Sequence, residues 1–293
     1  MRSAHHALLL TLGLLAACQA DDAPEASGAP ADEAVAAATT AAEPVTIVST
    51  DFAFEAPASI EGGRREIRLV NRGAELHHIQ FVRIDEGHDL EDLMAAYAAG
   101  DFHPSFAHDV GGPNPAAPGA EISATVDLKP GRYALLCVIP SPDMTLHVEK
   151  GMVAEMEVTE PATPVAATGP ATAPEPDLVL TMRDYSFDFS GPITAGTHTI
   201  RVETEAEQSH EIVIFALPEG GTAQAIVAWI EAGQQGPPPF RPVGGVAALS
   251  AGETNEVTID FAPGRYAFIC FIPDAGDGAP HFVHGMMQEY TVT

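Results

Sequence analysis

Two stretches of almost identical sequence, PGRYALLCVIP at Pro130–Pro140 and PGRYAFICFIP at Pro263–Pro273, decide how the chain is interpreted. In each stretch a Pro-Gly turn precedes an apolar run. A tyrosine, a large apolar residue and a cysteine occupy every second position of this run and therefore share one face of a strand. A single cysteine in an apolar strand is usually an inert core residue. Its return in the same frame raises the question of what two such cysteines do.

The similarity extends well beyond these two stretches. A shift of 133 positions places Pro130 on Pro263. With this shift, about three residues in ten are identical between Asn71 and Cys137. The matches include two glycine pairs, Gly111-Gly112 and Gly244-Gly245. A long similarity at one fixed offset indicates a tandem duplication. We therefore predict two domains of ordinary size, at residues 44–159 and 177–293.

Each domain is predicted to be mostly β. Short apolar runs alternate along the chain, and TIVSTDFAFE and LVLTMRDYSFDF open the two domains as strand-like segments. One helix is expected per domain, with Asp89 and Thr222 as N-caps and Gly100 and Gly233 closing the helices. The pattern favours an all-β fold with one short helix per domain, arranged as two tandem Greek-key β-sandwiches or barrels.

The N-terminus has the pattern of an export signal. Residues 1–17 contain an apolar run that is too short for a permanent membrane helix. The run ends in LAAC, which resembles the lipobox of bacterial lipoproteins and implies cleavage before Cys18 and lipidation of Cys18. Because Gln19 follows instead of aspartate, the resemblance implies an outer-membrane anchor and a chain that faces the periplasm. An ordinary secretory signal with an unrelated cysteine is the alternative.

Two segments have the composition of linkers. Residues 18–43 are rich in Ala, Pro, Glu and Asp without an apolar period, and we interpret them as a disordered tether. Residues 160–176 have the same character and are predicted to link the two domains.

The formal net charge of −28 restricts the possible partners. Nucleic acid and anionic membrane surfaces would repel such a chain, whereas a basic protein would be attracted. Contact with a membrane is therefore expected only through the lipid on Cys18. The alternative is that the acidity serves only to keep an exported protein soluble.

Two cysteines remain if Cys18 carries lipid. Export favours a disulfide between Cys137 and Cys270. However, equivalent core positions of two separate domains should lie farther apart than the roughly 7 Å between Cα atoms that a disulfide permits. We therefore expect both thiols to be free.

The residues around each cysteine form a possible metal-binding set. Downstream of Cys137 and Cys270 the chain twice contains His-x-x-x-Gly-Met, and upstream a histidine lies on an apolar strand face in each domain. One thiolate, two imidazoles and one thioether make up the ligand set of a blue-copper site. Zinc would gain little from the methionine, and magnesium, calcium or manganese would prefer oxygen ligands.

At this point both domains resemble the cupredoxins, the plastocyanin-like family. The resemblance is carried by the Asn-x-Gly lead-in at Asn71 and Gly73, by the Pro-Gly-x-Tyr-x-x-x-Cys strand and by the His-x-x-x-Gly-Met ending. It implies an eight-stranded Greek-key sandwich, one type 1 copper per domain and one-electron transfer. The ligands that it implies are His77, Cys137, His147 and Met152 in the first domain and His210, Cys270, His281 and Met286 in the second.

The chain also departs from the family pattern. Nine residues separate Cys137 from His147 and ten separate Cys270 from His281, which is longer than in small plastocyanins. The second domain lacks the Asn-x-Gly lead-in. These departures leave the geometry of the two sites open.

Several assignments have rivals within the sequence. His78 could replace His77, but the repeat places Glu211 opposite His78. Met287 could replace Met286, but its counterpart is Val153. The roles of His78, of His284 and of the loop histidines His103 and His108 stay open; the two loop histidines could form a further metal site with Asp109.

The residues flanking each cysteine bear on enzymatic function. Multicopper oxidases and copper nitrite reductases place a histidine beside the cysteine to reach a second copper, whereas Leu136, Val138, Ile269 and Phe271 stand here. We therefore predict no enzyme, unless a further site forms between subunits. The leading hypothesis is a lipid-anchored, two-centre carrier that exchanges single electrons with a respiratory redox protein such as a cytochrome. A copper-holding or delivery protein and a metal-free scaffold or adhesion module are the alternatives.

Overall fold

The computed structural model describes residues 43–162 and 175–293. The predicted signal peptide, Cys18, nearly all of the tether and most of the inter-domain linker lie outside these residues. The boundaries predicted for the two domains stay predictions, and the stretches before and after the linker are called here the first and second halves.

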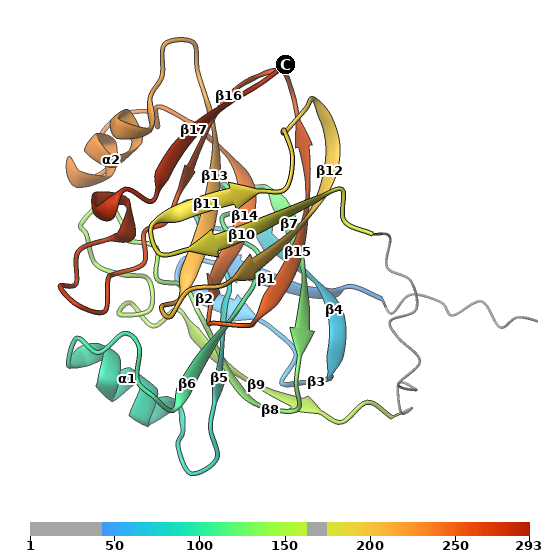
Figure 1. Ribbon diagram of the computed structural model, residues 1–293. Helices are drawn as coiled ribbons and strands as arrows, with labels where there is room; N and C mark the ends of the chain where they lie inside the picture. The colour runs from blue at the N-terminus through green and yellow to red at the C-terminus, as the bar shows by residue number, and fades with distance from the viewer. Residues whose placement is uncertain (1–42, 163–174) are drawn as a thin grey trace, which may run out of the picture. The chain divides into compact units, whose positions relative to one another are not determined.

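Strands dominate both halves (Figure 1). The first half contains β1 (Val45–Thr50), β2 (Ala53–Glu55), β3 (Ser59–Glu61), β4 (Gly63–Asn71), β5 (Gln80–Ile84), β6 (Ala107–Gly111), β7 (Glu121–Leu128), β8 (Gly131–Leu136) and β9 (Val153–Thr159). The second half contains β10 (Leu178–Arg183), β11 (Ser186–Phe189), β12 (Gly196–Thr204), β13 (His210–Leu217), β14 (Arg241–Leu249), β15 (Thr254–Phe261), β16 (Gly264–Ile269) and β17 (Met287–Val292). One α-helix lies in each half, α1 (Leu90–Ala98) and α2 (Ala223–Glu231), and a 3₁₀ helix spans His281–His284. This mostly β fold with one short α-helix per half is the predicted class.

The strands form two sheets that both continue from one half into the other. The first sheet has the order β11-β10-β12-β15-β7-β4-β1-β2, and the second has the order β17-β16-β13-β14-β6-β5-β8-β9-β3. The halves meet where β15 pairs with β7 and where β14 pairs with β6. Each half therefore contributes a part of both sheets, which gives it two layers.

The apolar core of each half lies between its two layers. In the first half, buried side chains of β4 such as Leu69 meet Phe81 of β5 and Leu135 of β8. Alternate residues of β8, Ala134 and Leu136, belong instead to a cluster with Leu93 of α1. Since side chains alternate along a strand, the PGRY strand packs on the core with one face and on the helix with the other.

Both predicted helices form, and each begins directly after its predicted N-cap. The Asp89 carboxylate accepts a hydrogen bond from the Asp92 N–H, and the Asp92 side chain returns one to the Asp89 N–H, which completes a capping box. Thr222 caps α2 by accepting from the Ala225 N–H.

The two opening segments are not the single strands that their alternation suggests. Each folds back on itself as a tight hairpin, β1 with β2 and β10 with β11. The reversals fall at Asp51-Phe52 and at Asp184-Tyr185, where Tyr185 takes a positive φ of 65°. A two-residue turn leaves the alternation of apolar residues unchanged in the strands before and after it. The alternation alone therefore does not distinguish a hairpin from a single strand.

Candidate metal centres

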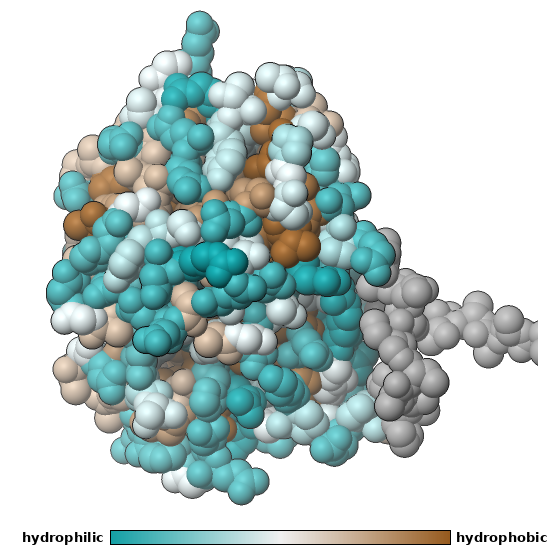
Figure 2. Space-filling view, in the orientation of Figure 1, coloured by the Kyte–Doolittle hydropathy of each residue, from teal (hydrophilic) through white to brown (hydrophobic). Residues whose placement is uncertain are grey.

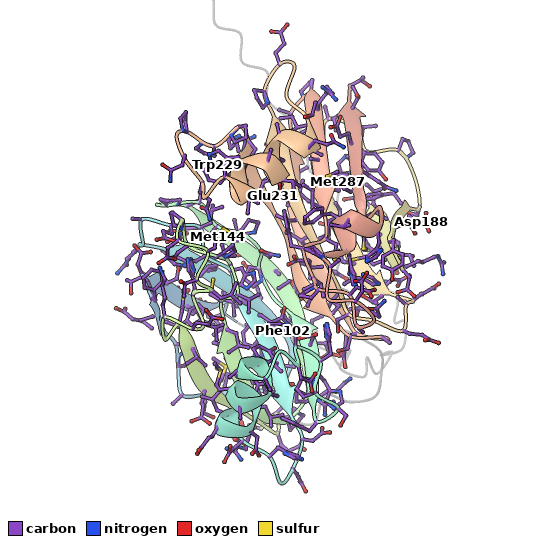
Figure 3. All side chains as sticks on the ribbon, turned by 90° about the vertical axis from the view of Figure 1, so that its left-hand side faces the viewer. Phe102, Met144, Asp188, Trp229, Glu231 and Met287 are labelled. Atoms are coloured by element: carbon purple, nitrogen blue, oxygen red, sulfur yellow. The ribbon has the colours of Figure 1, made fainter. Side chains whose placement is uncertain are left out.

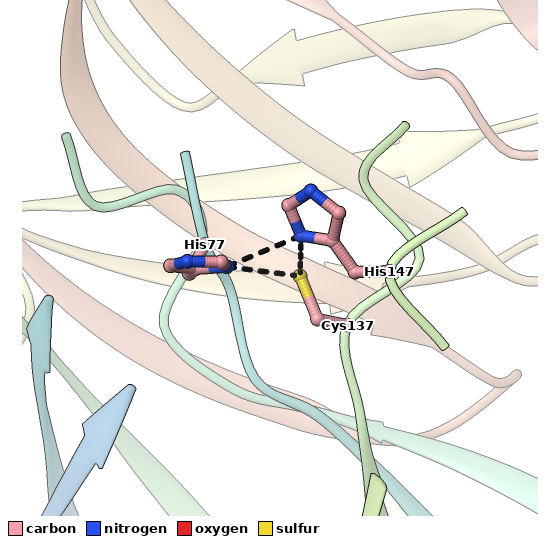
Figure 4. A group of neighbouring side chains, drawn as sticks. All are labelled: His77, Cys137 and His147. Atoms are coloured by element: carbon pink, nitrogen blue, oxygen red, sulfur yellow. Dashed lines mark hydrogen bonds between the residues drawn. The ribbon is translucent and has the colours of Figure 1, made fainter. Parts of the chain in front are cut away.

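Three predicted ligands of the first half converge on one buried point (Figure 4). His77 precedes β5, Cys137 directly follows β8, and His147 lies in the loop before β9. The Cys137 Sγ lies 3.3 Å from Nδ1 of His147 and 3.9 Å from Nδ1 of His77, and the two Nδ1 atoms are 3.1 Å apart. All three side chains are fully buried. Three donor atoms from distant parts of the chain thus share one small space.

The second half repeats the arrangement. The Cys270 Sγ lies 3.4 Å from Nδ1 of His281 and 4.0 Å from Nδ1 of His210. His210 begins β13, and His281 begins the 3₁₀ helix after β16. These side chains are also fully buried. Cys137 and Cys270 are both free thiols, as expected.

The two methionines lie beside these groups through backbone hydrogen bonds. The Cys137 N–H donates to the Met152 carbonyl, and the Met152 N–H donates to the His147 carbonyl. Cys270, Met286 and His281 repeat this pattern. Met286 belongs to the inner core, whereas its rival Met287 packs in the cluster around α2. The axial role of Met152 and Met286 stays a prediction, because no described contact joins their sulfur atoms to the other ligands.

Carboxylates fix which nitrogen faces the centre in three of the four histidine rings. Asp51 lies 2.7 Å from Nε2 of His77, and Glu75 lies 2.9 Å from Nε2 of His147. In the second half Asp184 lies 3.0 Å from Nε2 of His210. An imidazole that donates its Nε2–H to a carboxylate keeps the lone pair on Nδ1 free for a metal.

His281 departs from this pattern. Its Nε2 is 3.9 Å from Asp274, which instead accepts hydrogen bonds from Tyr185 and Gln208. Among the described residues, no group lies within hydrogen-bonding distance of this Nε2. The two centres therefore differ in how the second histidine is oriented.

The supporting carboxylates were not among the predicted site residues. One signal was available, because Asp51 and Asp184 stand at the same 133-residue offset as the ligands. Each lies at the reversal of an opening hairpin, so its position depends on a turn that the apolar pattern did not show.

These carboxylates lead to a prediction about metal affinity. Replacing Asp184 by alanine is expected to weaken copper binding at the second centre by about 10- to 100-fold, because the His210 ring loses the partner that orients it. The matched control is Asp188→Ala, which removes a neighbouring exposed carboxylate that pairs with Arg183. Chelator competition measures the affinity of each centre. Equal effects of the two substitutions would contradict the assignment.

Burial sets the protonation of the ligands before metal binds. Desolvation lowers the pKa of His77, His147 and His210, and lowers the pKa of His281 to about 4. Desolvation also raises the pKa of Cys137 to about 12 and raises that of Cys270. At neutral pH the rings are therefore neutral and both thiols are protonated.

This protonation state predicts how copper binding depends on pH. Each metal ion must displace one thiol proton and no imidazole proton, so affinity should rise about tenfold per pH unit between about pH 7 and about pH 9. Chelator competition at several pH values checks the slope. A pH-independent affinity would show that no thiol proton is displaced.

The other histidines are used differently. Both ring nitrogens of His78 are engaged, with the Asn114 side chain and the Val138 N–H. His103 contacts the Pro273 carbonyl and His108 contacts Asp85, so the described residues bring no loop metal site together there. His284 lies in a group with exposed Asp277 and largely buried Asp274.

Comparisons with known proteins found similar solved structures with TM-scores below 0.5. No family model and no curated protein matches the chain. Similar solved structures include dithionite-reduced auracyanin from Roseiflexus castenholzii, with 23% identity over 39% of this chain and 94% of that chain, at a TM-score of 0.28. A blue copper oxidase from Nitrosomonas europaea has 16% identity over 84% and 85% of the two chains, at a TM-score of 0.23. A copper-containing nitrite reductase from Thermus scotoductus has 10% identity over 85% and 61%, at a TM-score of 0.23.

The two-layered, mostly β architecture of each half is the kind that the sequence resemblance to the cupredoxins implies. At TM-scores below 0.5 these likenesses carry no argument about fold or function. The case for a metal therefore depends on the side chains themselves.

The donor atoms of the first centre fit a soft metal ion such as copper. The Nε2 atoms of His77 and His147 are the ones that face carboxylates, so their two Nδ1 atoms present lone pairs to each other at 3.1 Å. Two facing lone pairs beside a buried thiol repel each other unless a cation lies between them. A thiolate and two neutral imidazoles are ligands that suit copper.

Proposed function

We propose that the chain is a lipid-anchored, two-centre blue-copper protein that carries single electrons to or from a redox partner. The observation that carries this proposal is the convergence of Cys137 with His77 and His147, repeated by Cys270 with His210 and His281. Copper held there would supply a one-electron Cu(II)/Cu(I) couple. The type 1 character of each site and the count of one copper per half are part of the proposal.

The chain itself would hold the ligands in one geometry throughout the redox cycle. The cysteine of each centre accepts a hydrogen bond from a backbone N–H, from His78 to Cys137 Sγ and from Glu211 to Cys270 Sγ, each at 3.5 Å. Such N–H groups stabilise a thiolate, and full burial excludes water from the sulfur. Fixed ligands and a dry site favour electron transfer, because little has to reorganise.

We propose a carrier and not an enzyme. The residues flanking Cys137 are Leu136 and Val138, and Ile269 and Phe271 flank Cys270. None of these apolar side chains can ligate a second copper. The full burial of the ligands argues against the alternative of copper delivery, since a metal that is handed on needs an accessible ligand.

A basic redox protein such as a cytochrome is the proposed partner. The net charge is −28, and hydrophilic residues cover most of the face shown in Figure 2. Partly exposed Asp51, Glu75 and Asp184 stand at the outer edges of the ligand histidines. These carboxylates would attract cationic side chains toward the edges where electrons enter or leave.

Localisation in the periplasm on an outer-membrane lipid anchor belongs to the same proposal. It rests on the sequence before residue 43, which the structure does not describe. In the described ranges 43–162 and 175–293, no helix has the length and apolar character needed to cross a bilayer.

Stopped-flow mixing of the reduced, copper-loaded protein with a basic c-type cytochrome tests the carrier proposal. We expect rapid cytochrome reduction whose rate falls as ionic strength rises, because opposite charges steer the encounter. Copper should stay with the chain. Loss of copper to a chelator without electron exchange would favour the delivery alternative instead.

A further inference from the structure

A continuous chain of hydrogen bonds joins the two cysteines across the boundary between the halves. On the first side, the His78 N–H contacts the Cys137 sulfur, and the His78 ring contacts Asn114 at 3.1 Å. Asn114 donates its amide N–H to the Glu211 carboxylate at 2.7 Å. On the second side, the Glu211 N–H contacts the Cys270 sulfur. The three residues of this bridge are therefore His78, Asn114 and Glu211.

The two ends of the bridge are anchored in the same way. The Val138 N–H donates to Nε2 of His78 at 3.0 Å, and the Phe271 N–H donates to Glu211 Oε1 at 3.0 Å. Val138 and Phe271 are the residues directly after the two cysteines. His78 and Glu211 are the two end residues. Each contacts the sulfur of its cysteine through its backbone N–H, and its side chain accepts from the N–H of the residue that follows that cysteine.

The direction of every hydrogen bond in the bridge is determined. Since the Val138 N–H can only donate, Nε2 of His78 accepts, and the ring proton of His78 lies on Nδ1. That proton is donated to the Asn114 oxygen, which directs the Asn114 amide nitrogen toward Glu211. Glu211 accepts at both of its oxygens. The donor and the acceptor of each contact are therefore assigned, so the chain of contacts has one order.

The bridge is also buried. His78, Asn114 and Glu211 are exposed by 2%, 1% and 5%. They are among the residues that line a cavity of about 390 Å³ between the halves, whose walls are mainly apolar. Phe102 and Met144 from the first half, and Trp229 and Glu231 from the second, also line this cavity and are labelled in Figure 3.

The internal repeat shows that the bridge is not a relic of the duplication. The counterpart of His78 is Glu211, and the counterpart of Asn114 is Ala247. Two copies of either end residue would not give this order of donors and acceptors. The bridge therefore depends on positions at which the two halves carry different residues.

We propose that His78, Asn114 and Glu211 form the path by which one electron passes between the two metal centres. This inference rests on the proposed function, because it requires copper at both sites. In the step, the reduced centre is oxidised by one electron and the oxidised centre is reduced by the same electron. No bond forms or breaks, and no proton leaves the bridge. Hydrogen bonds in a low-dielectric interior couple the two sulfurs more strongly than an empty gap of the same length.

The test compares two buried asparagines that both join the halves. Asn114→Leu removes both side-chain hydrogen bonds of the bridge and keeps the number of side-chain heavy atoms. The matched control is Asn255→Leu, because Asn255 is equally buried and also bonds across the boundary, to Val110 and Gly112, but contacts neither cysteine. Both are made in a Met286→Gln background, in which a changed axial ligand separates the potentials of the two centres.

The measurement is the first-order, concentration-independent relaxation that follows pulse reduction of the full-length, copper-loaded protein. Asn114→Leu is expected to slow this relaxation by about tenfold, because apolar contacts replace two hydrogen bonds, whereas Asn255→Leu leaves it unchanged. Equal rates in the two variants, with both copper bands intact, overturn the inference and leave the proposed function standing. Absence of copper bands in the unsubstituted protein overturns both.

A second variant keeps the test decisive if Asn114→Leu fails to fold. Glu211→Gln is nearly isosteric and still accepts from Phe271, but it turns an amide donor toward the Asn114 donor and breaks the bridge at that point. It is expected to slow the relaxation to a similar extent. Nitrogen NMR of the metal-free protein provides an independent readout, since the bridge requires His78 to carry its proton on Nδ1. A proton on Nε2 overturns the inference.

Discussion

Replacing Cys137 by serine is expected to abolish the intense copper–thiolate absorption of the first centre and to leave that of the second centre in place. Serine matches the size of cysteine but cannot supply the thiolate that a soft metal site needs. The two groups share no ligand, so copper content should fall from two ions per chain to one. Visible absorption and metal analysis measure both quantities.

The reciprocal substitution is the control for this prediction. Cys270→Ser should remove the second band and spare the first, and the double variant should lack both bands while keeping its fold. Retention of an unchanged spectrum in either single variant would show that its cysteine is a core residue and not a ligand.

Replacing Gly245 by alanine is expected to destabilise the fold by at least about 3 kcal/mol, a large part of the stability of an ordinary protein. A Cβ atom there would lie 2.0 Å from the Ile212 carbonyl oxygen and 2.8 Å from that of Asn114. The φ angle of 149° is also one that residues with a side chain rarely adopt. The strand that carries His210 would have to move away from β14, so copper binding at the second centre should be lost as well.

Gly112→Ala should do the same at the first centre, because its Cβ would lie 2.1 Å from the Ile79 carbonyl oxygen, two residues after His77. Gly191→Ala is the control, since a Cβ there meets only Leu178 at an ordinary 3.5 Å. Denaturant unfolding measures the difference in free energy. A change below about 1 kcal/mol for Gly245→Ala would contradict the close approach of the two strands.

The repeat explains why much of the fold and of the ligand set was predictable. The signals are local: the alternation in the PGRY strands, the N-caps Asp89 and Thr222, and the His-x-x-x-Gly-Met endings. Because of the duplication, each signal could be checked against its counterpart in the other half. Where the repeat is broken, as at His78 and Glu211, the same comparison favoured His77 over His78 as the ligand and left the role of His78 open.

The features that the sequence did not reveal depend on distant contacts. The hairpin reversals that place Asp51 and Asp184 beside the ligand histidines preserve the apolar pattern on either side. Asn114 meets Glu211 only because the sheets continue between the halves, through β15 with β7 and β14 with β6. No spacing in the sequence predicts a contact of that kind.

The central claim is that each half holds one copper ion on a thiolate and two imidazoles. The most direct test is to add Cu(II) to residues 19–293 and to record copper content together with the visible spectrum before and after reduction. We predict two copper ions per chain and an intense thiolate band that disappears on reduction and returns on oxidation. A protein that stays folded, binds no copper and shows no such band would contradict the account.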